Sequence, residues 1–397
     1  MRTQLTLLLL LGLVACGGGG DSSPTAQVDP APTTPPDSTT PPADNNTDPN
    51  SACALNPTGV NWEALMNEDC EDLSQYNLFA DSQDPTAHPV GNGIAYALSS
   101  ELFTNYAQKY RFLFLPDGQQ ISYQAEDTFT LPVGSVLSKT FSLPSDTQLS
   151  GREHQTLIET RLLIHRQSGW TTLAYVWQQG QAKLNVVGAD IPHTFNHQGQ
   201  QISFDYHVPS RAECKLCHQL NENDVSSISP IGLKAQLLNH SIDTSQGLSQ
   251  LSHWQTLGMI AGLPDASTIP HAPNILDQSG DLTARAKGYI DINCAHCHRA
   301  EGFASISGLR LGFHVDHTSY PYGVCKQPPG WDGGAKGLSY DIIPGDAEHS
   351  IMVYRQELNG AKDRMPPIGR AMVHQEAVNV IRQWIDMMSP SLGDCQS

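Results

Sequence analysis

Apolar and polar residues alternate along much of the chain between residues 94 and 208, and this pattern predicts β-strands. Apolar side chains recur at every second position in several short runs: 110–114, 121–125, 157–165, 170–177 and 202–208. That spacing is typical of strands with one buried face, and Pro-Asp-Gly at 116–118 is one of the turns that separate the runs. We therefore predict a β-rich, sandwich or barrel-like domain over residues 53–207.

After residue 208 the apolar residues recur at the three- and four-residue spacing of amphipathic helices. This spacing predicts helices in five places: 231–238, 248–257, 281–294, 350–358 and 374–388. Asp281 is a good N-cap for the third helix, and Ser210 for a short turn before Cys214. The predicted fold is therefore multidomain, with the β-rich domain followed by two mainly α segments, 208–275 and 276–397.

The first 16 residues have the pattern of a bacterial lipoprotein signal peptide. Arg2 is followed by an apolar run at 5–13, too short to span a bilayer as a mature helix, and Leu-Val-Ala-Cys at 13–16 matches a lipobox. Cys16 would then carry lipid and anchor the protein to a membrane. Gly17 favours the outer membrane, with the protein facing the periplasm or the cell surface. The alternative is an ordinary signal peptide with an incidental cysteine.

Residues 17–52 are predicted to be a disordered tether. Four glycines lead into a segment of Ser, Thr, Pro, Asp and Asn with almost no apolar residue. Such a segment cannot bury enough surface to offset the entropy lost on ordering. It would hold the folded part away from the lipid surface, or act only as a spacer.

Two copies of the pattern Cys-x-x-Cys-His carry the candidate chemistry: Cys214-Lys215-Leu216-Cys217-His218 and Cys294-Ala295-His296-Cys297-His298. This is the attachment pattern of c-type haem, because two thiols one turn apart can add to the vinyl groups of a haem and the next histidine faces the iron. We therefore predict two covalently attached haem c groups. The four cysteines bind the porphyrins, His218 and His298 bind the iron atoms, and both haem segments are expected to be cytochrome c-like.

A zinc site and a redox pair are the two other interpretations of the paired cysteines. Two Cys-x-x-Cys pairs can form a tetrahedral zinc site, but positions 214 and 294 are 80 residues apart, well outside the usual zinc-ribbon spacing. A thioredoxin-like redox pair needs no histidine after its second cysteine. Haem attachment explains every residue of both motifs.

Four of the nine cysteines remain after lipidation and haem attachment: Cys53, Cys70, Cys325 and Cys395. An even remainder in an exported protein predicts two disulfides. The sequence alone allows three ways of pairing these four cysteines. Proximity favours Cys53–Cys70, which leaves Cys325–Cys395.

The sixth ligand of each iron decides between electron transfer and catalysis, because a methionine closes the iron and raises its potential. Met365 is the candidate for the second haem, since Pro366 and Pro367 stiffen its loop. Met259 is the candidate for the first haem. Three histidines compete with Met259: His240, His253 and His271.

From about residue 96 to 388 the chain resembles a family of di-haem c-type cytochromes exported by Gram-negative bacteria. Five stretches carry the resemblance: Phe103–Lys109, Ile158–Ile164, Ala284–His298, Ile342–Asp346 and Met365–Arg370. The resemblance implies a β-rich domain before two haem segments, and it implies little about the substrate or partner. The tether and lipid anchor are not part of the family's pattern.

The favoured hypothesis is a di-haem lipoprotein that transfers electrons between periplasmic or outer-membrane redox proteins. The formal net charge of −18 argues against nucleic acid and suits a partner with a basic docking face, although solubility alone also explains it. One alternative is a di-haem peroxidase with an open first iron, for which His240 and His271 are the candidate bases. Another is a binding or sensing module built on the β-rich domain.

Overall fold

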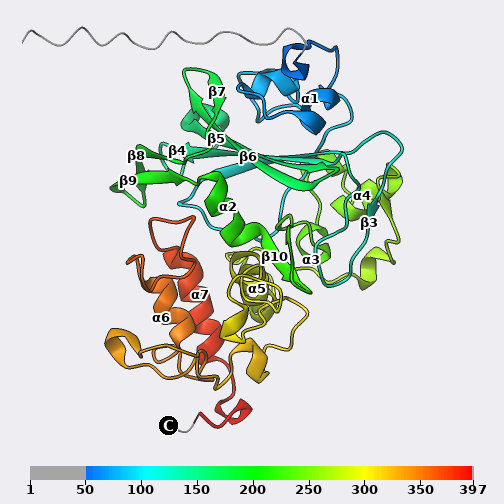
Figure 1. Ribbon diagram of the computed structural model, residues 1–397. Helices are drawn as coiled ribbons and strands as arrows, with labels where there is room; N and C mark the ends of the chain where they lie inside the picture. The colour runs from blue at the N-terminus through cyan, green and yellow to red at the C-terminus, as the bar shows by residue number, and fades with distance from the viewer. Residues whose placement is uncertain (1–50, 396–397) are drawn as a thin grey trace, which may run out of the picture. The chain divides into compact units, whose positions relative to one another are not determined.

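The structure is a computed structural model that describes residues 51–395 (Figure 1). The predicted signal peptide with Cys16, and all but the end of the predicted tether, lie outside the described residues. Among the described helices, none has the length and apolar character needed to cross a membrane.

An antiparallel sheet of six strands forms the centre of the described part, in the order β1-β2-β4-β5-β6-β7. Its strands are β1 (Ile94–Ala95), β2 (Gln108–Phe114), β4 (Val136–Pro144), β5 (Gln155–Arg166), β6 (Gly169–Gln178) and β7 (Gln181–Leu184). The predicted strand pair around residues 167–169 is confirmed as β5 and β6, joined by a tight turn. The hairpin of β8 (Ala189–His197) and β9 (Gln200–Val208) forms a separate two-stranded sheet.

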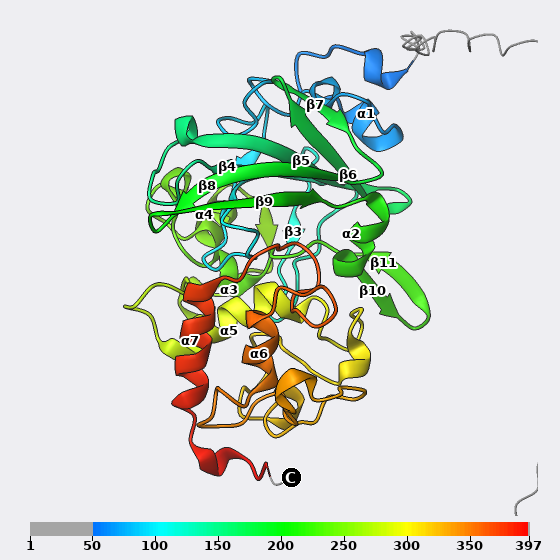
Figure 2. The ribbon, with the colours of Figure 1, turned by 90° about the vertical axis from the view of Figure 1, so that its left-hand side faces the viewer.

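Both faces of the six-stranded sheet are buried, whereas the alternation of apolar residues predicts only one buried face. One face packs under residues 52–79, which include α1 (Trp62–Asn67), through side chains such as Phe114 and Tyr175. The opposite face packs Leu113, Leu137 and Leu163 against the segments that follow the sheet. The sheet is therefore the middle layer of the fold, and Figures 1 and 2 show it edge-on and from a second side.

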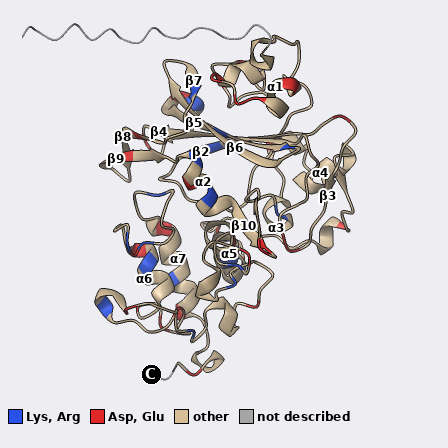
Figure 3. Cartoon of the chain, in the orientation of Figure 1, with Lys and Arg blue, Asp and Glu red and all other residues tan. Residues whose placement is uncertain are grey.

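Short elements joined by long loops follow the sheet. They are α2 (Arg211–His218), β10 (Gln219–Glu222), β11 (Val225–Ile228), α3 (Ala235–Leu238), α4 (Gln250–Thr256), β12 (Ile260–Ala261), α5 (Leu282–Ile290), α6 (Ile351–Glu357) and α7 (Gln375–Asp386). Strand β12 pairs in parallel with β3 (Ile121–Ser122), which ties this region back to the first half of the chain. Figure 3 shows charged residues spread over the sheet, the helices and the loops.

The predicted fold class is wrong. The chain was expected to form a sandwich or barrel-like domain followed by mainly α, cytochrome c-like segments, but the described residues are mostly β-sheet with seven short α-helices. The longest of these helices, α7, has only 12 residues. Periodicity located helices after residue 208, but glycines and prolines in the long connection between α5 and α7 keep most of that region in turns.

The predicted disulfides are confirmed: Cys53 is bonded to Cys70, and Cys325 to Cys395. The first fastens the segment that covers one face of the sheet, and the second holds the end of the chain on the loop that precedes α6. The two bonds close loops of very different length, with separations of 17 and 70 residues.

We expect loss of the longer bridge to destabilise the protein more than loss of the shorter one. Cross-linking restricts the unfolded chain more strongly as the loop grows, by about 3 kcal/mol for the Cys53–Cys70 loop and about 4 kcal/mol for the Cys325–Cys395 loop. Replacing both cysteines of each pair by alanine and comparing guanidinium unfolding would measure this. A larger loss for the Cys53–Cys70 variant would contradict the expectation.

Candidate functional site

Helix α2 presents the first motif, and its start is fixed by the predicted cap at Ser210. The Ser210 side chain accepts a hydrogen bond from the backbone N–H of Glu213, and the Glu213 carboxylate accepts one from the Ser210 N–H in return. This capping box satisfies the first turn of a helix only eight residues long. Cys214 and Cys217 are three residues apart in the helix and therefore lie on one face of it.

The hairpin of β10 and β11 returns the chain to His218. Nδ1 of His218 lies 2.8 Å from the carbonyl oxygen of Ser229, and the Ser229 N–H donates to the His218 carbonyl at 2.7 Å. A carbonyl can only accept, so Nδ1 carries the proton and Nε2 keeps its lone pair for a metal. Burial, assisted by the charge of Lys139, lowers the pKa of His218 to about 4, which keeps the imidazole neutral.

The second motif follows α5 through one π-helical turn, Asp291–Ala295. The Asp291 carboxylate fixes this turn by accepting hydrogen bonds from Lys234 at 2.8 Å and from the Phe313 N–H at 3.0 Å. The N–H groups of Cys297 and His298 both donate to the Cys294 carbonyl, at 3.1 and 2.9 Å. The π turn therefore ends in a tight loop that carries the second cysteine and the histidine.

His298 is held in the same way as His218, through a side chain instead of a carbonyl. The Ser307 hydroxyl donates to the Ala304 carbonyl at 2.6 Å and lies 2.9 Å from Nδ1 of His298. Because the single hydroxyl proton is engaged, Nδ1 of His298 is the donor and Nε2 is again free for a metal. Burial lowers the pKa of His298 to about 4.

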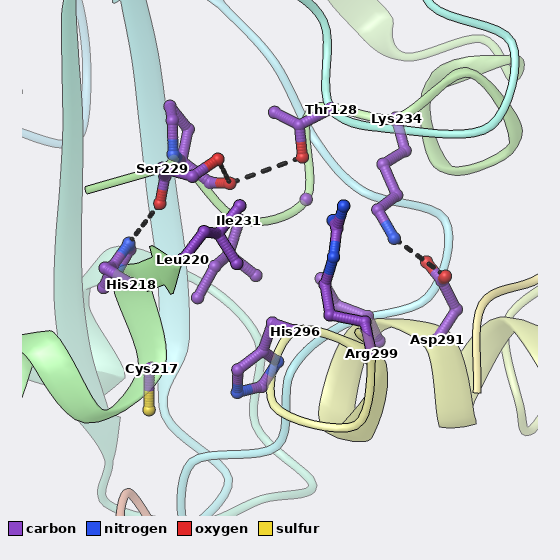
Figure 4. A pocket seen from close by; sticks show the side chains of 13 residues that line it. Thr128, Cys217, His218, Leu220, Ser229, Ile231, Lys234, Asp291, His296 and Arg299 are labelled. Carbon is purple, nitrogen blue, oxygen red and sulfur yellow. Dashed lines mark hydrogen bonds and ion pairs between the residues drawn. The ribbon is translucent and has the colours of Figure 1, made fainter. Parts of the chain in front are cut away.

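The structure brings the two motifs into contact, although they are far apart in sequence. The ligand atoms of Cys217, His296 and Cys297 all lie within 4.8 Å of one another. Nδ1 of His296 is buried and has no hydrogen-bond partner within the described residues. Figure 4 shows His296 and Cys217, which belong to different motifs, facing the same pocket.

The four motif thiols differ in environment. The neighbouring thiol of Cys297 lowers the pKa of Cys217, and that of Cys217 raises the pKa of Cys297. Burial raises the pKa of Cys214, and it raises the pKa of Cys294 to about 12. The contact between the motifs therefore centres on one thiol of each, while Cys214 and Cys294 lie outside it.

A large cavity, here called the sheet cleft, lies between α2 and the inner face of the six-stranded sheet. It encloses about 950 Å³ of space outside atoms, including its open mouth, and Cys214, Cys217 and His218 line it. Its other walls are mostly apolar, with Leu162 and Leu163 among them, and two basic residues, Lys139 and Arg161, also face it. This lining, apolar with a few polar and charged groups, is typical of a site for a mainly apolar ligand.

Two further cavities lie beside the second motif. His298 lines one of about 820 Å³, together with Arg310 and Leu311. Cys294 lines another of about 320 Å³, together with Met365. Three of the four motif cysteines, Cys214, Cys217 and Cys294, and both Nε2-free histidines border space that the chain leaves open, which fits attached haem groups. Cys297 does not line these cavities of the described part and instead lies against Cys217.

The predicted sixth ligands are placed differently. Met365 shares a cavity with Cys294, and Arg370 holds its loop by donating to the Met365 carbonyl at 2.9 Å. Met259 packs against the apolar cluster around Trp254 and is not among the residues lining the cavities beside the first motif in the described part. His240 and His271 lie beside each other, with ring centroids 6.3 Å apart, and also do not line the sheet cleft.

Sequence reasoning missed three residues of the site: His296, Lys139 and Arg161. His296 carried a signal, because it is an additional histidine inside the second motif. Lys139 and Arg161 carried a weaker one, as basic residues within strongly apolar strands. No protein-family model, curated protein or solved structure matches this chain. The resemblance to exported di-haem cytochromes therefore stays a prediction.

Gly302 is required where the chain folds back over the second motif. A Cβ atom at this position would lie 2.4 Å from the Cys297 carbonyl oxygen and 2.8 Å from that of His296. Both neighbours are backbone atoms of the motif, so they cannot move aside as a flexible side chain does.

We expect Gly302→Ala to lower the free energy of unfolding by about 1–3 kcal/mol, the usual cost of overpacking. Gly360→Ala is the matched control, because a Cβ atom there meets nothing within 4 Å. Denaturant unfolding of both variants would compare them. Equal stability of the two would show that the loop over the motif is less tightly packed than described.

Proposed function

We propose that this protein carries two covalently attached c-type haems and transfers electrons between redox proteins. One observation supports this most directly: both Cys-x-x-Cys-His motifs hold their histidine by Nδ1, through Ser229 and Ser307, and leave Nε2 free. Such an arrangement is typical of metal-binding histidines, and two unrelated loops produce it here.

The chain's own residues would hold the groups at two neighbouring places. Cys214 and Cys217 would bind one porphyrin beside the sheet cleft, and Cys294 and Cys297 would bind the other. When bound, each haem supplies an iron centre that accepts and releases one electron. Since Cys217 and Cys297 are in contact, the two attachment points are neighbours, which favours electron passage within the chain.

The arrangement gives less support to a peroxidase. A peroxidase needs a base near an open iron, and the predicted bases His240 and His271 do not line the sheet cleft, although His207 and His296 do. His240 instead hydrogen-bonds the Ala97 carbonyl at 3.1 Å and Gln250 at 3.0 Å. Electron transfer to a soluble partner, from an outer-membrane anchor on Cys16, is accordingly the activity that we propose.

A metal-ion site is the second candidate, because Cys217, His296 and Cys297 already form a cluster of three ligand atoms. A structural zinc site needs four such ligands, and a catalytic one uses three with water. This alternative leaves Cys214, Cys294 and the orientation of both held histidines without a role. The two proposals exclude each other, because a thiol bonded to haem is not a free metal ligand.

Removing cysteines in pairs would separate the two proposals. We expect the pyridine haemochrome spectrum and intact mass of the mature protein to show two haems per chain. Cys214→Ala/Cys217→Ala and Cys294→Ala/Cys297→Ala should each retain one haem, and the control Cys325→Ala/Cys395→Ala should retain both.

A single bound zinc ion with no haem would contradict the proposed function. In that case zinc should be lost in Cys217→Ala and in Cys297→Ala, and it should be retained in Cys214→Ala and in Cys294→Ala. Elemental analysis of the four single variants would show this pattern.

Met365 is proposed as the sixth ligand of the second haem. We expect Met365→Ala to lower the midpoint potential of one haem and to let it bind carbon monoxide, because a thioether ligand raises the potential and closes the iron. Met387→Ala is the control, since that side chain is 71% exposed. Redox titration followed optically would measure both effects, and unchanged potentials in Met365→Ala would remove this assignment.

A further inference from the structure

A row of basic residues crosses the face of the sheet that lines the sheet cleft. Arg111 on β2, Lys139 on β4 and Arg161 on β5 are direct neighbours in the strand register. Like charges at opposed positions repel one another, so each needs a compensating anion. Figure 3 shows basic segments on these strands close to α2.

Two members of the row have acidic partners. Arg111 pairs with Glu101 at 2.8 Å, and Glu101 also accepts from Lys109 at 3.2 Å. Arg161 forms a two-point ion pair with Glu159, whose carboxylate also accepts from the Tyr206 hydroxyl. Glu101 and Glu159 therefore already pair with three cations, Lys109, Arg111 and Arg161.

Lys139 has no ion pair among residues 51–395. Its ammonium lies 5.1 Å from the centre of the Phe141 ring, and the Arg161 guanidinium lies 4.5 Å from the same ring. Burial, together with Arg161 and the other cations, lowers the pKa of Lys139 to about 7. An ammonium group in such a place is costly unless an anion joins it.

Glu213 is the acidic side chain among the residues lining the sheet cleft, and it is already engaged. Its carboxylate accepts from Ser210 at 2.8 Å and lies 3.2 Å from Nε2 of His207. Among residues 51–395 no carboxylate forms an ion pair with Lys139, and an acidic group that enters the cleft can supply one.

We propose that Lys139, with Arg161 beside it, binds a carboxylate of the porphyrin attached at Cys214 and Cys217. The inference rests on the proposed function and extends it to the sheet. All four residues line the same cleft, and a haem carries two propionate carboxylates on the edge of an otherwise apolar ring. The apolar walls suit the ring, and the two cations suit its acidic edge.

The sheet would then supply one wall and the counter-charge of the first haem. A fixed positive charge near the porphyrin favours the reduced iron, which carries one more electron, and so raises its midpoint potential. The β-rich part of the chain would act most directly on the first haem, because His298 and Cys294 of the second motif line other cavities.

The test is a redox titration of the haem-loaded protein with Lys139→Met and Lys139→Gln. We expect the midpoint potential of one haem to fall and that of the other to stay unchanged, with two haems still attached. Lys139→Arg should restore the higher potential. The redox-difference infrared band of a porphyrin carboxylate should move in Lys139→Met and in Lys139→Gln.

Lys183→Met is the matched control, because Lys183 is an exposed lysine on β7 of the same sheet and pairs with Asp72. Two haems with unchanged potentials in Lys139→Met would overturn the inference and leave the proposed function intact. Citrate that shifts the potential of the unmodified protein but not of Lys139→Met would show a site for a diffusible anion, and would also overturn the inference. Absence of haem from the unmodified protein would overturn both.

Discussion

The hydrogen bond at Nδ1 of each motif histidine is the constraint on which the rest of the site depends. An imidazole can bind a metal through Nε2 only if Nδ1 keeps its proton, and that proton needs an acceptor. The hairpin of β10 and β11 brings the Ser229 carbonyl to His218, and the loop after the second motif brings the Ser307 hydroxyl to His298. The β10–β11 hairpin and the loop after the second motif therefore each place one acceptor for a motif histidine.

The second motif is also positioned from outside its own segment. Asn293, directly before Cys294, accepts a hydrogen bond from the Phe103 N–H at 2.8 Å and donates to the Glu101 carbonyl at 3.2 Å. Glu101 in turn pairs with Arg111 on the sheet. A continuous set of polar contacts thus links the sheet to the π turn and so fixes the second motif relative to the sheet.

Local features of this site could be predicted from the sequence, whereas its assembly could not. The cap at Ser210, the pair β5 and β6 and the disulfides depend on short-range patterns or on the parity of cysteines, and all are present. The contact of Cys217 with Cys297 depends on packing across the whole chain, and no spacing rule contains it. Helical periodicity likewise predicted longer helices than those observed, because it does not show where turn-forming residues end a helix. Met259 was selected by residue type alone, and its apolar side chain found a place in the core instead.

The net charge of the whole chain and the charge of the sheet cleft have opposite signs. The formal net charge is −18, yet the wall of the sheet cleft carries basic residues in excess of their acidic partners. An acidic protein has many carboxylates to spare, so an unpaired, half-buried lysine is not a consequence of composition. Lys139 costs stability for as long as the cleft holds no anion. A ligand that brings its own carboxylate removes this cost, so binding in the cleft and stability of the sheet are linked through one ammonium group.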